Sequence, residues 1–204
     1  MTLSSKPLNT LLTEFRSSAP TPGGGSAAAL SGALGASLLA MVARLPKPRA
    51  TAEPDLAALK AAADRSETLA LALEALIDRD AEAYDGVVSA YRLPKGTDEE
   101  KAARTARIQT ALRSAIDTPL EVMRACAAAI TEVPLLLAMG NANAASDVKV
   151  GLELLRAGLR GAHYNVAINL DAVKDEAYRA AVQSESERLA LSESDGAAAP
   201  SAPS

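Results

Sequence analysis

Residues 26–43 read SAAALSGALGASLLAMVA, a run of 18 residues without a charged side chain. The segment directly before this run is Pro22-Gly23-Gly24-Gly25. Proline and glycine at this density oppose a helix, whereas an alanine-rich run favours one. The sequence therefore predicts a loop followed by a helix that begins at Ser26, a residue type suited to capping, and ends at about Leu45.

One face of this predicted helix carries small residues, at Ala28, Gly32, Ala36 and Ala40. Such a face allows another helix to approach closely, in a core or at a subunit interface. The run also meets the length threshold for a membrane span. However, it is built mainly from Ala, Gly, Ser and Leu, and neither end has a Trp or Tyr anchor. We therefore favour a buried helix and expect no membrane association.

The rest of the chain also has the period and the punctuation of helices, and no stretch shows the alternation of a strand. The sequence predicts an all-α fold: residues 1–191 form one dimeric domain, a bundle of about seven helices, and residues 192–204 form a disordered tail. The first three predicted helices cover residues 7–17, 26–45 and 55–91. The fourth begins at a cap formed by Thr97 and Glu100, and the fifth runs from Pro119 to Met139 with a bend at Pro134. The last two run from the 141–147 junction to Leu170 and over residues 171–191.

The composition excludes several classes of function. The 204 residues include one Cys, one His and no Trp, with 21 basic and 25 acidic side chains. A single Cys and a single His are too few for an internal disulfide or an ordinary zinc site, so we expect no metal. A net charge of −4 and 2% aromatic residues argue against nucleic-acid binding. Because the first residues lack a secretion signal and Cys126 is unpaired, we expect a cytoplasmic protein.

Asp80 interrupts an apolar stripe on the predicted helix 55–91, between Leu76 and Tyr84. A buried carboxylate is unfavourable unless it is paired, hydrogen-bonded or protonated. The structural explanation would be an ion pair with Arg79 or Arg104. The functional explanation would be contact with a cationic ligand or a role in proton transfer.

The glycine loop at residues 23–25 is a second candidate site. Three flexible glycines before a helix expose backbone N–H groups, which could bind an anion or let a flat ligand approach the main chain. A tight linker between packed helices would explain the same sequence.

Polar residues also gather at residues 141–147, where Asn141, Asn143 and Asp147 exceed what capping of one helix requires. Asp147 and Asn165 share one face of the following helix but lie roughly 27 Å apart at 1.5 Å per residue. If both are functional, they belong to different subunits or to the two ends of a long ligand.

Among the basic residues near loop ends, Lys95 is the best candidate, because Pro94 and Gly96 hold it at a helix junction. Basic residues in such positions are usually solvated surface. We expect Cys126 and His163 to be structural, because neither has an evident catalytic partner. The other basic residues in this group are Lys47, Arg49, Arg104 and Arg107.

Several motifs occur in a characteristic order along the chain. They are Ala19–Gly25 before the Ala/Gly helix, Leu93-Pro94-Lys95, Thr97–Lys101, Ile108-Gln109, and Gly140-Asn141 through Ser146-Asp147 to Asn165-Val166 and Asn169. Together these motifs resemble the C-terminal family of formiminotransferase-cyclodeaminases, over about Leu8 to Leu189. One difference is the segment 46–49, Pro-Lys-Pro-Arg, where the family often has a loop rich in glycine and lysine.

The resemblance implies an all-helical homodimer that binds tetrahydrofolate in a cleft near the subunit interface. It implies one of two reactions through the same methenyl cation: hydrolysis of 5,10-methenyltetrahydrofolate to 10-formyltetrahydrofolate, or release of ammonia from formiminotetrahydrofolate. We favour the cyclohydrolase, because the chain has no transferase domain and residues 93–101 look closest to that branch. A non-catalytic folate-binding scaffold is the third interpretation.

Either reaction needs an anion beside the amidinium carbon and a group that moves a proton. On this resemblance Asp80 is the expected carboxylate, with Asp147 as the alternative, and no cofactor is expected besides the folate substrate. Lys95 and Gln109 would position water or substrate carbonyls. The expected substrate-binding residues are Gly23, Gly24, Gly25, Ser26, Asn141, Asn143 and Asn165.

Overall fold

The computed structural model describes residues 2–191, and over this range it is built from helices and loops, which confirms the all-α prediction. Residues 192–204, predicted to be a disordered tail, lie outside the described residues. The elements are α1 (Leu8–Phe15), α2 (Gly24–Arg44), α3 (Glu53–Tyr91), α4 (Asp98–Ile130), α5 (Val133–Met139), a 3-10 turn (Ala142–Ala144), α6 (Ala145–Leu170) and α7 (Glu176–Leu191).

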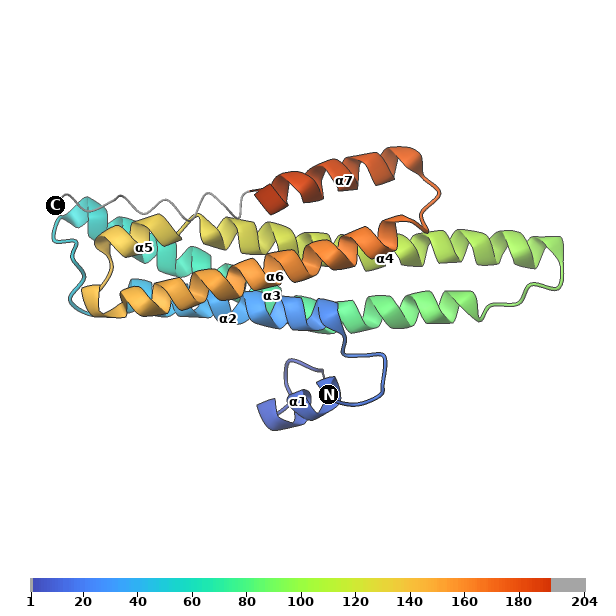
Figure 1. Ribbon diagram of the computed structural model, residues 1–204, viewed down its shortest axis with the longest axis horizontal. Coiled ribbons are helices and arrows are strands. Elements are labelled where there is room, and N and C mark those ends of the chain that lie inside the picture. The colour runs from blue at the N-terminus through green and yellow to red at the C-terminus, as the bar shows by residue number, and fades with distance from the viewer. Residues whose placement is uncertain (1, 192–204) are drawn as a thin grey trace.

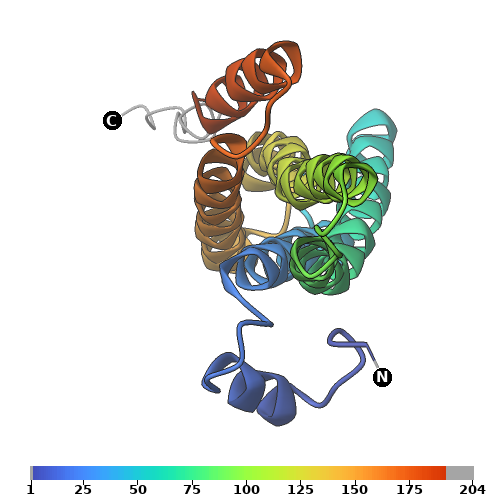
Figure 2. The ribbon, with the colours of Figure 1, turned by 90° about the vertical axis from the view of Figure 1, so that its right-hand side faces the viewer.

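Four long helices, α2, α3, α4 and α6, pack side by side, and α7 lies against α4 and α6 (Figures 1 and 2). In both views α1 stands apart, so within the described residues the packed bundle consists of the six α-helices α2–α7 rather than about seven. The segment before α1 is tied to the bundle because the backbone N–H groups of Leu3 and Ser4 donate to the Asp78 carboxylate. The α3–α4 hairpin projects beyond the ends of α2 and α6 (Figure 1).

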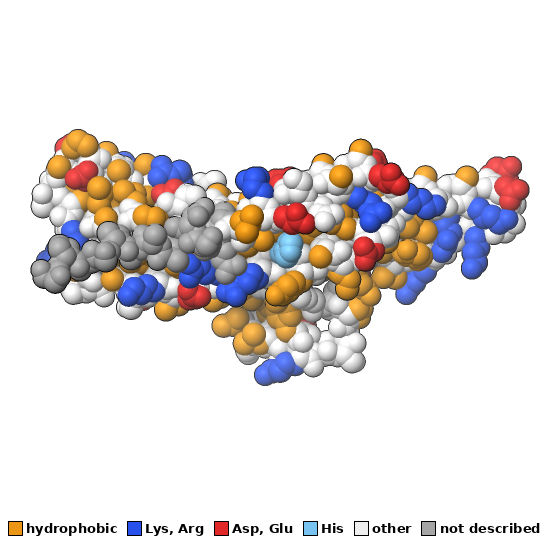
Figure 3. All heavy atoms as spheres, turned by 45° about the horizontal axis from the view of Figure 1, so that its top comes forward, with side chains coloured by type: hydrophobic (Ala, Val, Ile, Leu, Met, Phe, Trp, Pro, Cys, Tyr) orange, Lys and Arg blue, Asp and Glu red, His pale blue; other side chains and the backbone are white. Residues whose placement is uncertain are grey.

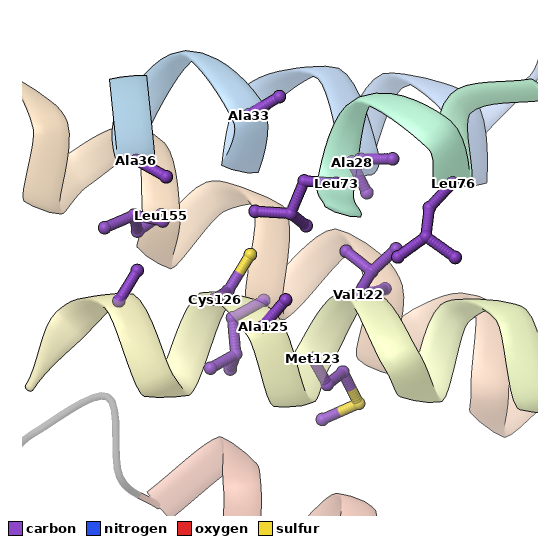
Figure 4. Packing of buried hydrophobic residues seen from close by; sticks show 14 of the residues in the cluster. Ala28, Ala33, Ala36, Leu73, Leu76, Val122, Met123, Ala125, Cys126 and Leu155 are labelled. Atoms are coloured by element: carbon purple, nitrogen blue, oxygen red, sulfur yellow. The ribbon is translucent and has the colours of Figure 1, made fainter. Parts of the chain in front are cut away.

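The small residues of α2 let it pack closely against α6, as their spacing predicts. A Cβ on Gly35 would lie 2.7 Å from the Gly151 carbonyl oxygen, and a Cβ on Gly158 would lie 2.8 Å from the Ala28 carbonyl oxygen. The α2 and α6 backbones are therefore too close to accept larger side chains. Leu73 of α3 and Cys126 of α4 pack against α2 at Gly32 (Figure 4).

Two described segments, α2 and residues 98–139, are long and apolar enough to cross a membrane. Helices in the core of a folded bundle pass the same test. Of the apolar windows in these segments, 56% and 44% respectively are buried inside the structure, so packing between helices accounts for much of their apolar character.

The prediction of a new helix at Pro119 is wrong, because α4 runs without a break from Asp98 to Ile130. A proline inside a helix has no N–H to donate to the carbonyl four residues earlier, here Ala115. The Asn169 side chain of α6 supplies the missing donor, with Nδ2 at 3.3 Å from the Ala115 oxygen. The interruption is therefore compensated by a residue 54 positions later in the chain.

Other boundaries also differ from the prediction. The predicted bend at Pro134 is a break, since α4 ends at Ile130 and α5 begins at Val133 with the proline in its first turn. The last helix begins at Glu176 instead of 171. The N-cap of α2 is Gly23, and Ser26 lies inside the first turn of the helix. The capping box of Thr97 and Glu100 is present as predicted.

Candidate active site

A cleft of about 280 Å³ lies where α2 begins and α6 ends. Its walls come from the loop before α2 and from four helices, so residues far apart in the sequence meet there. Clefts with a few convergent polar groups are the usual form of a small-molecule site. The lining residues are Pro20, Thr21, Gly23, Gly24, Gly25, Asp80, Ala83, Tyr84, Val87, Ala115, Asn165 and Asn169.

Asp80 is partly buried in this cleft and holds the N-terminus of α2. The backbone N–H of Ser26 donates to Asp80 Oδ2 at 2.8 Å, which satisfies one of the unpaired amides of the first turn. Gly25 must lack a side chain, because a Cβ there would collide with the Asp80 carboxylate. Burial raises the pKa of Asp80 above its ordinary value, although the hydrogen bonds from Ser26 act in the opposite direction.

The Ser26 hydroxyl is placed to serve both protonation states of Asp80. Its oxygen lies 2.9 Å from the Ile77 carbonyl oxygen and 3.0 Å from Asp80 Oδ2, but a hydroxyl has one proton to donate. When Asp80 is ionised, the hydroxyl can donate to the carboxylate. When Asp80 is protonated, the carboxyl can donate to Ser26, which then donates to Ile77. This arrangement suits a group that gains and loses a proton.

Neither of the arginines considered as partners neutralises Asp80. Arg79 forms a two-point ion pair with Glu121, with its shorter distance 2.6 Å. Arg104 donates to the Tyr91 carbonyl oxygen instead. Asp80 is therefore held by the amide and hydroxyl of Ser26, and within the described residues no cation balances the ionised carboxylate.

Two asparagines near the end of α6 form the opposite wall. Asn165 Nδ2 donates to the Gly161 carbonyl oxygen at 2.8 Å. Asn169 Nδ2 donates to the carbonyl oxygens of Ala115 and Asn165, which uses both of its hydrogens. The side-chain carbonyl oxygens of both asparagines remain able to accept from a ligand N–H.

Asn169, Tyr84 and Val87 line the cleft but were not among the predicted site residues. Their spacing from the predicted site residues on the same helices could have indicated that they line the same cleft. Tyr84 and Val87 follow Asp80 on the same face of α3, and Asn169 lies one turn after Asn165.

The structure does not bring the 141–147 junction into this cleft. The Asn141 amide donates to the Pro46 carbonyl oxygen at 2.7 Å, and its oxygen accepts from the Asn143 backbone N–H at 2.9 Å. These bonds hold the start of the 3-10 turn at the opposite end of α6. Asp147 lies in the first turn of α6, at that same end.

Lys95 and Gln109 are also outside the cleft. The Gln109 side chain bridges the connection between α6 and α7, donating to the Ala172 oxygen at 3.1 Å and accepting from the Lys174 N–H at 2.8 Å. Lys95 is exposed in the loop at the end of the α3–α4 hairpin. Cys126 is fully buried between helices, and burial raises the pKa of its thiol to about 12. His163 lines a separate hollow between α6 and α7.

Comparison with known proteins identifies the class to which this fold and cleft belong. A sequence profile described as formiminotransferase-cyclodeaminase matches residues 7–188, so the chain belongs to that family. It is 45% identical over 171 residues to a methenyltetrahydrofolate cyclohydrolase of Methylorubrum extorquens, covering 84% of this chain and 82% of that protein.

Other members of the family are longer or more distant. A formimidoyltransferase-cyclodeaminase of Sus scrofa is 35% identical over 178 residues, which is 87% of this chain but only 33% of the pig protein. The crystal structure of a formiminotetrahydrofolate cyclodeaminase of Thermotoga maritima superposes with a TM-score of 0.83 at 27% identity, covering 95% of this chain and 93% of that one.

Proposed function

We propose that this protein is a methenyltetrahydrofolate cyclohydrolase, which hydrolyses 5,10-methenyltetrahydrofolate to 10-formyltetrahydrofolate. The observation that carries the proposal is the Asp80 carboxylate, which faces the cleft without a cationic partner among the described residues. The substrate is itself a cation at the carbon that reacts, so it supplies the missing positive charge. The similarity to a cyclohydrolase over most of both chains supports the same reaction.

In the proposed reaction Asp80 has two roles. The ionised carboxylate stabilises the amidinium and accepts a proton from water as the water oxygen bonds to the methenyl carbon. The bond from that carbon to N5 then breaks, and Asp80 returns the proton to N5. The second proton of the water is released to solvent. Rotation of the Ser26 hydroxyl accompanies each change of charge on Asp80.

The remaining walls suit the pterin ring. The free side-chain oxygens of Asn165 and Asn169 can accept from pterin N–H groups. Gly23, Gly24 and Gly25 let the ring approach the α2 backbone. Tyr84 and Val87 offer an apolar surface to one face of the ligand.

The cyclodeaminase reaction is the second candidate, favoured by the close superposition on the Thermotoga maritima enzyme. There N10 attacks the formimino carbon, ammonia leaves, and the same methenyl cation is formed. A carboxylate beside that carbon stabilises the cation as product.

Two assays of the purified protein separate these candidates. We expect it to accelerate the loss of the near-ultraviolet absorbance of 5,10-methenyltetrahydrofolate well above the spontaneous rate, with no comparable release of ammonia from 5-formiminotetrahydrofolate. Ammonia release without hydrolysis would establish the cyclodeaminase. Failure of both assays would leave a folate-binding scaffold.

We also propose that the protein is a homodimer. Exposed apolar side chains on α1 and α6 support this, among them Leu8 at 64%, Tyr164 at 69% and Ile168 at 76% exposure. Sedimentation equilibrium should give twice the chain mass of 20.9 kDa, and a mass equal to one chain at micromolar concentration would contradict the proposal.

The proposed reaction transfers no electrons, so we propose that the enzyme needs no cofactor. We also propose that the protein is cytoplasmic, because its free buried cysteine suits a reducing compartment.

A further inference from the structure

A stripe of side chains leads from the cleft along the projecting part of α3. Asp80, Tyr84 and Val87 line the cleft, and Tyr91 follows them on the same face at the end of the helix. Asp80 and Tyr91 are separated by eleven positions, or about 16 Å along the helix axis. Tyr84 and Tyr91 are 42% and 49% exposed, so much of both side chains is accessible to a ligand.

A matching stripe on α4 ends in a positive charge. Arg104, Ile108 and Ala115 lie on one face of α4, and Ala115 lines the cleft. The Arg104 guanidinium lies 5.5 Å from the centre of the Tyr91 ring and donates to the Tyr91 carbonyl oxygen at 3.0 Å. Arg104 also lies eleven positions from Ala115, so it is about 16 Å along α4 from that cleft residue, as Tyr91 is about 16 Å along α3 from Asp80.

Arg104 is pre-positioned but not neutralised. Its bonds to a carbonyl oxygen and its position over Tyr91 fix the guanidinium without using a carboxylate, and it forms no ion pair within the described residues. Glu100, one turn before Arg104 on α4, is used as a cap and accepts from the backbone N–H groups of Gly96 and Thr97. Figure 3 shows Lys and Arg side chains gathered over this projecting end of the molecule.

We propose that Arg104, held by Tyr91, binds the glutamate carboxylate of the folate substrate. The inference rests on the proposed function and extends it to the tail of the ligand. Methenyltetrahydrofolate has a cation at its reactive end, an aromatic ring in the middle and carboxylates at its far end. The protein presents the complementary order: the Asp80 carboxylate, the surface of Tyr84 and Val87, and then the Arg104 guanidinium.

The test compares ligands with and without the glutamate. The probes for binding are 5-formyltetrahydrofolate and 5-formyltetrahydropteroate, measured by titration calorimetry, and the methenyl forms of both serve for kinetics. The variants are Arg104→Gln, Arg104→Lys and the control Arg107→Gln. Arg107 also lies on α4 but lines the hollow that contains Arg79 and Glu82, not the cleft.

We expect the wild-type protein to bind the glutamate form about tenfold or more tightly than the pteroate, and Arg104→Gln to remove this preference. Affinity for the pteroate should stay unchanged, and in the kinetics the effect of Arg104→Gln should appear in KM for the glutamate substrate. Arg104→Lys should keep part of the preference, and Arg107→Gln all of it. Thermal unfolding of each variant shows whether the hairpin is intact.

Three results would overturn the inference: a wild-type protein without glutamate preference, an Arg104→Gln variant that keeps the preference, or one that weakens both ligands equally. The last result would assign Arg104 a purely structural role. Because binding is measured without turnover, a glutamate preference that depends on Arg104 would support this inference even if the hydrolysis assay failed.

Discussion

Replacing Asp80 by Asn is expected to lower kcat for methenyltetrahydrofolate hydrolysis by about 100-fold or more, the usual contribution of a proton-transfer group. The amide can still accept from the Ser26 N–H through its oxygen, so the N-terminus of α2 remains capped. It cannot become an anion or accept a proton from water. Stopped-flow absorbance measures the rate, and urea unfolding measures the stability.

Asp78→Asn is the matched control for this variant. Asp78 lies two residues earlier on α3 and binds the backbone of Leu3 and Ser4, outside the cleft. Its substitution should leave kcat within about twofold of the wild-type value, because it changes the same chemical group without touching the site. Near wild-type turnover in Asp80→Asn would remove Asp80 from the catalytic step.

The dependence on pH follows from the raised pKa of Asp80. As a base it acts when ionised, so kcat/KM should rise with pH through a pKa above the ordinary range of aspartate. Asp80→Asn should lack this rise.

The raised pKa of Asp80 also affects the stability of the fold. Since the folded-state pKa is above the unfolded value, the contribution of Asp80 to stability is present below the unfolded pKa and is lost as pH rises through the folded one. Asp80→Asn should therefore be at least as stable as the wild type at neutral pH.

The second large effect is expected at the crossing of α2 and α6. A Cβ on Gly158 would lie 2.8 Å from the Ala28 carbonyl oxygen and 3.0 Å from the Gly32 nitrogen. Both neighbours are backbone atoms, which cannot rotate away as a side chain would. Gly158→Ala should therefore force the helices apart and lower the free energy of unfolding by about 1–3 kcal/mol.

Gly86→Ala provides a control of the opposite sign. Gly86 lies inside α3, and a Cβ there would have no neighbour within 4 Å. Alanine has the higher helix propensity, so this variant should raise the free energy of unfolding by about 0.5–1 kcal/mol. Urea denaturation followed by circular dichroism measures both variants. If Gly158→Ala were as stable as the wild type, close contact of the two backbones would not be what requires glycine there.

The helices could be predicted from sequence because their evidence is local: apolar period, capping residues and breaks at glycine and proline. The continuity of α4 through Pro119 could not, because the compensating donor, Asn169, comes from another helix. The same distinction applies to the site. Asp80 was detectable as a charge in an apolar stripe, and the glycine loop as an exposed helix start.

The remaining site residues depend on packing between elements. Asn141 and Asn143 have a polar pattern that suggests a ligand, yet their side chains hold a local turn. Arg104 has the sequence context of an ordinary surface residue, and only the pairing of α3 with α4 places it above Tyr91. The spacing of residues along one helix predicts which of them share a face. Which residue of the neighbouring helix lies opposite them can be known only from the tertiary structure.

Pro119 does not line the cleft, but it affects the wall formed by Asn169. Its missing N–H leaves the Ala115 carbonyl in need of a donor, and Asn169 meets that need with its amide hydrogens. The Asn169 side-chain amide is thereby fixed against the flip that would exchange its oxygen and nitrogen, so only its oxygen is left for a ligand. An absent hydrogen in α4 thus determines that α6 presents an acceptor, so that ligand edges carrying N–H groups are favoured over edges carrying lone pairs.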